Sequence, residues 1–543
     1  MLNTLLTNLS RSQIDTYYGS GDWQRSTIHQ YVVRHASRSP EQVAIRSGHR
    51  AYSYSEILTA AGRLAAHLTS SGLRSGQRVA VWLPNRPAVA VALIACSRLG
   101  LVLCPSLHRS HTTREVLALL ETMGAAAFIG ELGYGADVPD ADFFAAASQL
   151  DTVRTVLNLM GSEGDLFAGV RPGPDPPELD DPDTVVYLAY TSGTTGHPKG
   201  VLHSDNTLLS NARALTSDWG IDSKSVVYSF SPVSHNLGFG AMVMTLMVGG
   251  EFVLHDADRG ASLSDKLRST AATFVVGVPT HAMDLVSELD AGAEPVTSVQ
   301  GFRVSGAMGS KGLASALQRH GIRMQSGYGM TEAGSHHYTR PTDDLERVTQ
   351  TSGRACRGFE ARIFDERDPE RPVAHGQVGQ IGCRGASLML GYFNDQTATE
   401  NAFNAAGWFM TGDLGWMDEE SYIRITGRSK DVIIRGGRNI YPAQIENLAM
   451  RYPAVALAAA IPVPDERLGE RVCLVVAARD GMVLEPAQLL AYLSAEGLSK
   501  FDMPEFVAAV DKFPLTASGK IMKSALSEAL DQGELLPEST DRL

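Results

Sequence analysis

The chain contains few cysteines for its length. Among its 543 residues there are five, and none forms a CxxC pair or a Cys/His cluster with the spacing of a zinc site. They are Cys96, Cys104, Cys356, Cys383 and Cys473. Because an odd number of scattered cysteines is typical of reduced thiols, we expect a cytoplasmic location and neither a disulfide framework nor a structural zinc.

Long hydrophobic runs and an excess of positive charge are also lacking. The longest apolar stretches, at 88–96 and 241–248, are shorter than the ~18 residues that span a bilayer. The first residues lack the basic and apolar regions of a secretory signal. Lysine and arginine total 47 against 60 acidic residues, a net charge of −13. We therefore expect no membrane span, no export and no nucleic-acid partner.

Alternating helical and extended patterns make up most of the chain, which is long enough for more than one domain. A helix is predicted at 54–72, where apolar residues recur every three or four positions, and another from 88 onward. Short β-rich runs lie at 77–83, 184–190, 251–255 and 273–278. This alternation predicts an α/β fold, with a large N-terminal domain of mixed or parallel β-sheets flanked by helices.

The pattern changes after Arg428. Strand-like segments at 455–462, 471–477 and 505–510 accompany a helix near 487–495, which predicts a small α+β domain. We place the large domain at 1–429 and the small one at 430–543, with the boundary at Lys430, and expect a frayed tail from 536 onward.

A glycine-rich segment, YTSGTTGHPKG at 190–200, directly follows a predicted strand. Its glycines let several backbone N–H groups turn toward one anion, its hydroxyls add donors, and its lysine adds positive charge. The segment predicts a polyphosphate-binding loop, although it lacks Walker A spacing and an ordinary turn is the alternative. The residues expected to bind are Thr191, Ser192, Gly193, Thr194, Thr195, Gly196 and Lys199.

This segment resembles the signature of the adenylate-forming enzymes, which include acyl-CoA synthetases, adenylation domains of nonribosomal peptide synthetases, and luciferases. Other motifs of that family follow in order, so the resemblance spans 27–529. They are SGA at 305–307, GYGMTE at 327–332, TGD at 411–413, GRSKD at 427–431, GGRNIYP at 436–442 and PLTASGK at 514–520. Each motif alone is weak, but the ordered set is specific.

The GYGMTE motif combines two glycines, an aromatic ring and side-chain oxygens. A single carboxylate beside a triphosphate suits Mg²⁺, which takes one or two carboxylates plus phosphate oxygens. The resemblance implies that Tyr328 stacks on adenine, Thr331 contacts the α-phosphate, and Glu332 helps to hold the magnesium. It also implies nucleotide contacts from Gly306, Ala307, Gly327, Gly329 and Met330. Without the companion motifs, a strand–turn–helix junction with Tyr328 in the core would be favoured.

Asp413 follows Thr411 and Gly412 in a predicted turn. A carboxylate accepts hydrogen bonds from two adjacent hydroxyls, which suits a ribose. The resemblance implies that Asp413 and Arg428 anchor this sugar. In isolation, an Asx turn and a solvated surface charge are the alternatives.

The C-terminal motifs are those that the resemblance connects with domain movement. Lys520 is implied to reach the substrate carboxylate and α-phosphate during adenylation, as a point charge that can enter and leave. Lys430 is implied to be the hinge, and Gly436 and Gly437 the lining of the coenzyme A channel. For Lys520 the alternative is a solvated lysine without a role at the site. For Lys430 and the two glycines it is a β-hairpin turn.

The acid pocket is expected around His235 and Asn236, together with Gly306 and Gly329. Family members often have an aromatic residue directly before this histidine, whereas this chain has Ser234. Asn236 either forms a hydrogen bond with a hydroxyl on the acid or caps the next helix. The pair His336-His337 lacks a third ligand, so we interpret it as rim residues and not as a metal site.

Together these features predict an AMP-forming acid–thiol ligase that uses ATP, Mg²⁺ and coenzyme A. A carboxylate attacks the α-phosphorus of ATP, pyrophosphate leaves, and a thiol then attacks the acyl-adenylate. The expected catalytic residues are Lys199, Thr331, Glu332 and Lys520. A medium-chain, alicyclic or aryl acid is favoured. The main alternative is an aryl-acid enzyme that loads a carrier protein. A luciferase-like oxygenase and a non-catalytic nucleotide-binding scaffold are less favoured alternatives.

Overall fold

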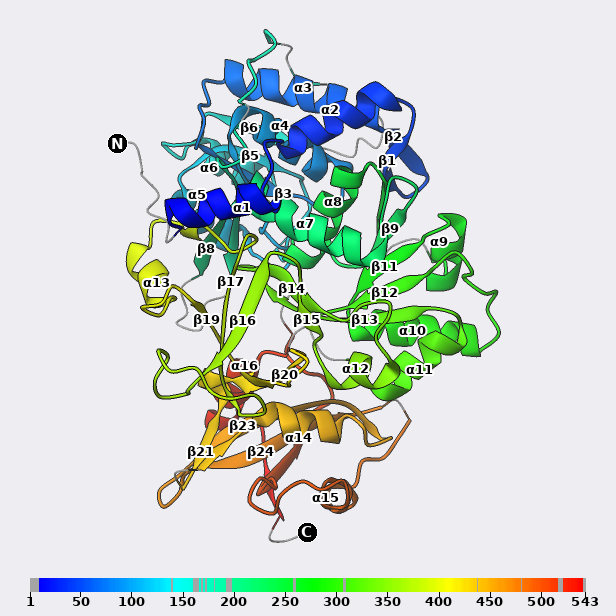
Figure 1. The fold of residues 1–543 in the computed structure, drawn as a ribbon, viewed down its shortest axis with the longest axis vertical. Coiled ribbons are helices and arrows are strands. Elements are labelled where there is room, and N and C mark those ends of the chain that lie inside the picture. The colour runs from blue at the N-terminus through cyan, green and yellow to red at the C-terminus, as the bar shows by residue number, and fades with distance from the viewer. Residues whose placement is uncertain are drawn as a thin grey trace. The chain divides into compact units, whose positions relative to one another are not determined.

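The computed structural model describes residues 9–137, 140–159, 166–167, 169–170, 173–179, 181–191, 198–256, 260–305, 309–436, 438–479, 481–515 and 521–540. The chain divides into two compact units (Figure 1). The larger unit comprises Met1–Glu360 and Arg384–Phe403, and the smaller comprises Ala361–Cys383 and Asn404–Leu543. The chain therefore leaves the larger unit, returns to it for one short segment, and leaves again.

The first sheet of the larger unit has the strand order β15-β14-β13-β12-β11-β9-β10-β1-β2. Its strands are β1 (Val43–Ser47), β2 (Arg50–Ser53), β9 (Val226–Ser229), β10 (Glu251–Leu254), β11 (Phe274–Gly277), β12 (Gly301–Val304), β13 (Arg323–Met330), β14 (Gly334–Tyr338) and β15 (Arg354–Ala355). From β1 through β13 the neighbours run parallel, and the pairs at both edges are antiparallel. The carboxyl ends of the parallel strands, where ligands gather in such sheets, thus meet at one edge.

The second sheet has the order β18-β8-β7-β4-β3-β5-β6. Its strands are β3 (Arg78–Trp82), β4 (Val102–Cys104), β5 (Ala125–Gly130), β6 (Thr155–Asn158), β7 (Val185–Thr191), β8 (Lys199–Ser204) and β18 (Gly391–Tyr392). Strands β3 to β7 pair in parallel, whereas β7–β8 and β8–β18 are antiparallel. Strand β18 comes from the segment that returns to the unit, and it extends the sheet beyond the hairpin that carries the glycine-rich motif.

Helices cover both sheets. They are α1 (Arg11–Ser20), α2 (Ile28–Arg38), α3 (Tyr54–Ser70), α4 (Pro87–Leu99), α5 (Thr113–Met123), α6 (Ala141–Ser148), α7 (Asp205–Trp219), α8 (Asn236–Val248), α9 (Leu263–Ser269), α10 (Pro279–Asp290), α11 (Lys311–Arg319), α12 (Leu345–Gln350) and α13 (Gln396–Asn401). Figure 1 shows α2, α3 and α4 side by side, where their contacts join them. Helix α3 buries Ile57, Ala61, Leu64 and Leu68, which are apolar residues that recur every three or four positions within the predicted helix 54–72, and it starts with a capping box formed by Ser53 and Glu56.

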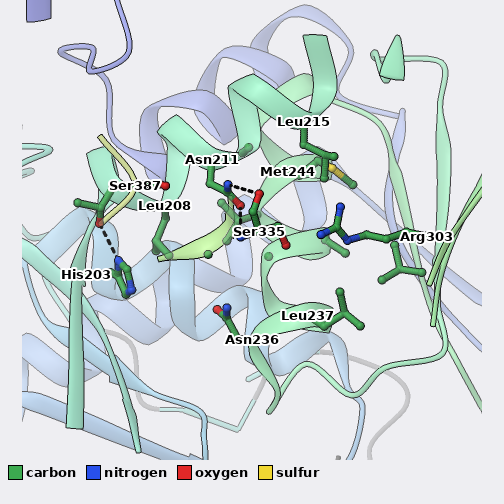
Figure 2. Close-up of a pocket in the computed structure, with 17 residues that line it drawn as sticks. His203, Leu208, Asn211, Leu215, Asn236, Leu237, Met244, Arg303, Ser335 and Ser387 are labelled. Carbon is green, nitrogen blue, oxygen red and sulfur yellow. Dashed lines mark hydrogen bonds between the residues drawn. The ribbon is translucent and has the colours of Figure 1, made fainter. Parts of the chain in front are cut away.

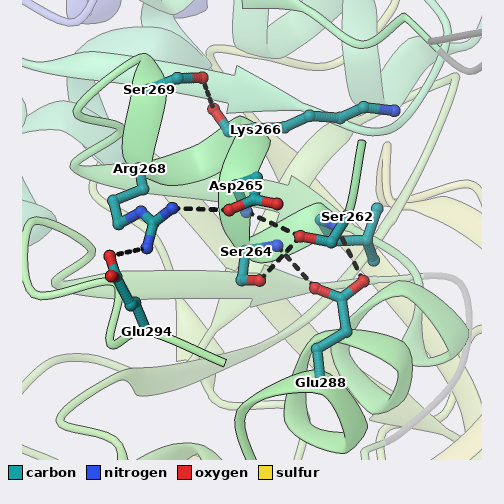
Figure 3. A network of polar contacts seen from close by, with 9 residues as sticks. Ser262, Ser264, Asp265, Lys266, Arg268, Ser269, Glu288 and Glu294 are labelled. Carbon is teal, nitrogen blue, oxygen red and sulfur yellow. Dashed lines mark hydrogen bonds and ion pairs between the residues drawn. The ribbon is translucent and has the colours of Figure 1, made fainter. Parts of the chain in front are cut away.

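Polar side chains fix the start of α9 against α10 (Figure 3). The Ser262 hydroxyl accepts a hydrogen bond from the Asp265 N–H, and the Glu288 carboxylate accepts from the N–H groups of Leu263 and Ser264 at 2.8 and 2.7 Å. Arg268 pairs with both Asp265 and Glu294. N–H groups at a helix start have no partner within the helix, so Glu288 satisfies two of them and joins the two helices.

The smaller unit contains a sheet of order β16-β17-β19-β20 and a second sheet in which β22-β21-β24-β25-β26 is joined by β23 on β24. Its elements are β16 (Phe359–Phe364), β17 (Gly379–Gly385), β19 (Phe409–Met417), β20 (Ile423–Arg428), β21 (Ile433–Arg435), β22 (Arg438–Ile440), α14 (Pro442–Ala449), β23 (Val455–Asp465), β24 (Gly469–Ala478), α15 (Pro486–Ala495), β25 (Phe506–Ala509), α16 (Lys523–Asp531) and β26 (Glu538–Ser539). An apolar cluster that includes Ile445, Leu474 and Leu493 packs α14 and α15 on the second sheet.

The predicted α/β fold with a separate α+β part is confirmed, because the apolar runs at 184–190, 251–255 and 273–278 form the buried strands β7, β10 and β11. The five cysteines are free and buried. The expectation of a frayed tail from 536 is wrong for Glu538 and Ser539, which form β26 and pair with β25, whereas 541–543 lie outside the described residues. The two units divide at 360, 383 and 403, and the boundary at Lys430 stays a prediction. In the described part of the chain, no helix has the length and apolarity required to cross a membrane.

Candidate active site

The glycine-rich motif connects two antiparallel strands of the larger unit. Thr191 ends β7 and pairs with Lys199, which begins β8. The Thr191 hydroxyl donates to the Lys199 carbonyl at 3.4 Å, a long hydrogen bond. The expected phosphate-binding residues Ser192, Gly193, Thr194, Thr195 and Gly196 lie outside the described residues.

The GYGMTE motif forms the end of β13 and the turn into β14. Met330 pairs with Gly334, so Thr331 and Glu332 lie at the tip of this hairpin, at the carboxyl end of a parallel strand. Gly329 is required here, because a Cβ at this position would lie 2.2 Å from the Gly334 carbonyl oxygen. The motif thus presents a hydroxyl and a carboxylate where the fold favours a ligand.

Tyr392 of β18 connects two of the predicted site residues. Its hydroxyl donates to Glu332 Oε1 at 3.0 Å, and its ring lies 4.9 Å from Lys199 Nζ. Burial and the adjacent Glu332 raise the pKa of Tyr392, so the hydroxyl stays protonated and keeps donating. Tyr392 therefore contacts both Lys199, the lysine of the predicted polyphosphate-binding loop, and Glu332, the carboxylate expected to hold magnesium.

Sequence analysis did not identify Tyr392, which stands in a short Gly-Tyr-Phe run without any phosphate-binding signature.

His203, a second residue that sequence analysis missed, holds the main chain at Thr331. Its Nε2 lies 2.7 Å from the Thr331 carbonyl oxygen and its Nδ1 lies 3.0 Å from the Thr207 hydroxyl. Burial lowers the pKa of His203 to about 4, so the ring is neutral at pH 7. Because a carbonyl only accepts, Nε2 carries the proton and Nδ1 accepts from Thr207. The sequence contained one signal for His203: residues four apart in a strand lie on the same face, and His203 comes four residues after Lys199.

The expected acid-pocket residues begin helix α8. His235 occupies the N-cap position without a side-chain cap, and Asn236 is the first helical residue. Asn236 Nδ2 donates to the Met330 carbonyl at 3.4 Å, so the structure does not support a capping role for Asn236. Gly329 lies one residue before Met330, whereas Gly306 and Ala307 lie outside the described residues.

His108, from the loop after β4, stacks on His235. The ring centroids are 4.1 Å apart with an interplanar angle of 13°, and His108 Nδ1 lies 3.2 Å from the Ser234 hydroxyl. Burial and the neighbouring imidazoles lower the pKa of His108 to about 3, so its ring is neutral. A ring from a distant part of the sequence thus contacts His235, although the residue directly before this histidine is Ser234.

A pocket joins these elements (Figure 2). It is a partly open hollow between α7, α8 and the strands beside them. The lining residues are His203, Thr207, Leu208, Asn211, Ala212, Leu215, Asn236, Leu237, Gly240, Ala241, Val243, Met244, Val276, Arg303, Gly334, Ser335 and Ser387. Both His203 and Asn236 line it while bonding the carbonyls of Thr331 and Met330, so the pocket adjoins the GYGMTE turn.

The interpretation of His336 and His337 as rim residues is wrong. Both are fully buried on β14, with the two Nδ1 atoms 2.7 Å apart and the Tyr328 ring edge-on to His336 at 4.7 Å. Strand alternation alone could not show that both faces of β14 are covered. The described residues contain no group of three or more His, Cys, Asp or Glu side chains that could hold a metal ion.

These two histidines should make the fold sensitive to acid. Burial lowers the pKa of His336 well below its usual value and that of His337 to about 3. In the unfolded chain a histidine has a pKa of ~6.5, whereas the folded chain keeps these two rings neutral. The free energy of unfolding is therefore highest above pH ~6.5 and decreases as the pH falls, because the unfolded chain then binds protons that the folded chain does not. Between pH 6.5 and pH 5, His337 should cost about 2 kcal/mol of the free energy of unfolding, and His336 should add a loss in the same direction. In urea denaturation we expect His337→Gln to lose about 2 kcal/mol less than the wild-type chain over this range.

The exposed His49 provides the control, because His49→Gln should leave this pH dependence unchanged. Parallel pH profiles for His337→Gln and the wild-type chain would contradict the prediction.

In the smaller unit, the expected ribose-binding residues lie opposite each other on β19 and β20. Arg428 Nε pairs with Asp413 Oδ1 at 3.0 Å, and the Asp413 N–H donates to the Thr411 hydroxyl. Asp413 is buried, whereas Arg428 is exposed. The structure thus brings together the two residues that sequence analysis had paired.

The remaining predicted residues of the smaller unit are on connections. Lys430 lies in the short 3₁₀ turn Ser429–Asp431 after β20, and Gly436 directly follows β21 with φ +56°. This backbone conformation suits glycine. Gly437 and Lys520 lie outside the described residues, and the hinge and channel roles stay predictions.

Comparison with known proteins agrees with this arrangement. The model of the AMP-binding enzyme family matches residues 32–393, and that of the AMP-binding enzyme C-terminal domain matches residues 444–520. The chain belongs to the AMP-binding enzyme family.

Among relatives of this AMP-binding enzyme, a feruloyl-CoA synthase from Amycolatopsis sp is 34% identical over 93% of this chain and 98% of its own length. A medium-chain fatty-acid–CoA ligase from Escherichia coli strain K12 is 29% identical over 94% of this chain and 91% of its own. Among solved structures, ATP-bound MatB from Rhodopseudomonas palustris has a TM-score of 0.83 and 29% identity, covering 92% of this chain and 98% of that one.

The resemblance stated from the motifs is therefore confirmed. The relatives support the predicted type of reaction, the ATP-dependent activation of a carboxylic acid with transfer to coenzyme A. They support ATP and coenzyme A as cosubstrates as well. The residue roles are proposed below.

Proposed function

We propose that this AMP-binding enzyme activates a carboxylic acid held in the pocket between α7 and α8 and transfers its acyl group to coenzyme A. One observation carries the proposal: two pocket-lining side chains, His203 and Asn236, bond the carbonyls of Thr331 and Met330. An acid in this pocket could place its carboxylate beside the turn that the family motif assigns to the α-phosphate.

Adenylation requires positioning and charge neutralisation more than covalent chemistry on the protein. We propose that Lys199, Thr191 and the undescribed loop donors bind the phosphates, that Tyr328 stacks on adenine, and that Thr331 contacts the α-phosphate. Asp413 and Arg428 bind the ribose hydroxyls, and Lys520 meets the charge that develops on the carboxylate and phosphate. His203 fixes the Thr331 backbone and thus acts through it.

The chain's residues fit a magnesium ion with one protein carboxylate. Glu332 is 9% exposed and accepts a hydrogen bond from Tyr392, whose ring also contacts Lys199, so this bond helps to fix its orientation. Mg²⁺ binds through one or two carboxylates together with substrate phosphates, which is the donor set expected here. When bound with ATP, the ion would neutralise phosphate charge.

The pocket lining supports an acid with a sizeable carbon skeleton. Apolar side chains from α7 and α8, including Leu208, Leu215, Leu237 and Met244, make up much of its wall. Gly240 and Ala241 leave room for bulk. We propose a medium-chain, alicyclic or aryl acid.

Acid-dependent ATP–pyrophosphate exchange across a panel of aliphatic, alicyclic and aryl acids tests the activation step, and mass spectrometry of reactions with ATP and free coenzyme A tests the acceptor. We expect exchange with at least one acid and formation of its acyl-CoA. Exchange without acyl-CoA would favour the alternative, transfer to the phosphopantetheine arm of a carrier protein. The absence of exchange with every acid would refute the proposal.

We further propose a cytoplasmic location, which free, buried cysteines suit.

A further inference from the structure

Arg303 on β12 is a buried cation with unused donors. The residue is 1% exposed, and its Nη1 donates to Gln325 Oε1 at 2.6 Å. Its Nε and Nη2 are buried and have no hydrogen-bond acceptor among the residues that the structure describes. An arginine has five N–H donors and no acceptor, so most of its donors here are unsatisfied by the described residues.

No described carboxylate compensates the Arg303 charge. The Tyr338 ring lies 5.7 Å from its Cζ, but the Tyr338 hydroxyl donates to Asp218, whose carboxylate pairs with Arg340. Burial lowers the pKa of Arg303 to about 10, so the guanidinium is still charged at pH 7. A buried charge without a partner is costly, and proteins keep such groups where a ligand or another charge completes them.

The guanidinium faces the pocket. Arg303 lines it, and Figure 2 shows its side chain extending into the pocket from the side opposite His203. A Cβ at Gly327 would lie 2.7 Å from Arg303 Nη2, so this nitrogen lies against β13 at Gly327. Gly327 precedes Met330 by three residues, which is about 10 Å of strand at ~3.3 Å per residue. Gly327 begins the GYGMTE motif, so the cation lies beside the start of this motif and away from its turn at Thr331 and Glu332.

We propose that the acid carries a second oxygen acceptor, a carbonyl or a carboxylate, at the end remote from the activated carboxyl, and that Arg303 binds this oxygen through Nη2 and Nε. This inference rests on the proposed function, because it places the activated carboxyl beside Thr331. The apolar residues of α7 and α8 would contact the carbon skeleton between the two ends. Arg303 would therefore determine specificity without contacting the reacting atoms.

Matched eight-carbon acids test the proposal on the unmodified chain. We would measure kcat/KM in pyrophosphate exchange for octanoic acid, 7-oxooctanoic acid and octanedioic acid. A hydrogen bond to a charged donor contributes about 1.5–3 kcal/mol, so at least one oxygen-bearing acid should exceed octanoic acid by about tenfold or more. Preference for the oxo acid would identify a carbonyl as the partner of Arg303, and preference for the diacid would identify a carboxylate. Octanoic acid equal to or better than both would overturn the proposal.

Substitution of Arg303 separates recognition from a structural role. Arg303→Met should remove the preference for the oxygen-bearing acid while changing the octanoic acid value by less than about threefold. Arg303→Lys, which retains one charged donor, should keep part of the preference. The exposed Arg323 on β13 gives the control, since Arg323→Met should leave the ratios unchanged.

An equal loss for all acids in Arg303→Met would show a structural role and overturn the proposal. Failure of the proposed function would look different, because the unmodified chain would then catalyse no exchange with any acid, octanoic acid included.

Discussion

Glu332→Gln should lower acid-dependent pyrophosphate exchange by about 100-fold or more, close to 3 kcal/mol of transition-state stabilisation. Glutamine keeps an oxygen that can accept the Tyr392 hydrogen bond, so the turn between β13 and β14 should remain folded. What it removes is the negative charge that suits magnesium beside the triphosphate. Initial rates at saturating acid and varied magnesium would measure the effect, and we expect the magnesium requirement to rise.

The control for this prediction is Glu346→Gln, which changes an exposed carboxylate on α12 and should leave exchange within about twofold of the unmodified enzyme. Tyr392→Phe should give a smaller loss, about tenfold, because the carboxylate stays but loses one orienting hydrogen bond. Exchange in Glu332→Gln within fivefold of the unmodified enzyme would refute the role given to Glu332.

Lys520→Ala should abolish adenylate formation, by about 100-fold or more, while largely sparing thioester formation from a supplied acyl-adenylate. The ammonium group is proposed to stabilise charge only while the carboxylate attacks the α-phosphorus, so the second half-reaction does not require it. Pyrophosphate exchange measures the first step, and acyl-CoA release from synthetic acyl-adenylate measures the second.

Lys512→Ala, at an exposed lysine eight residues earlier in the chain, serves as the control for general charge effects. An equal loss of both half-reactions in Lys520→Ala would reject this division of roles.

The sequence predicted those parts of the fold and site that depend on local patterns. Buried parallel strands read as apolar runs, so β7, β10 and β11 were found within two residues of their ends. The GYGMTE motif was recognised from its residues alone, and the close approach at Gly329 shows the steric need that one of its glycines meets. Asp413 and Arg428, which the resemblance assigned to the same sugar, lie together as an ion pair, and their role at the ribose stays a prediction.

Contacts between distant segments could not be predicted in this way. Tyr392 and His108 reach the site from positions 60 residues from Glu332 and 126 residues from Ser234, and neither lies in a recognisable motif. The burial of His336 and His337 depends on what covers each face of β14, which one strand cannot reveal. In the sequence, Arg303 cannot be distinguished from an exposed arginine, and only the structure shows that it is buried beside the pocket.

The path of the chain through its two units has a consequence for how such enzymes can be recombined. Strand β18 returns to the larger unit after an excursion through the smaller one, and it delivers the phenol that meets both Lys199 and Glu332. A fragment ending at residue 360 would keep both of those charged groups and lose the residue that links them. Exchange of whole modules between relatives should therefore preserve activity only when the crossover falls after residue 403.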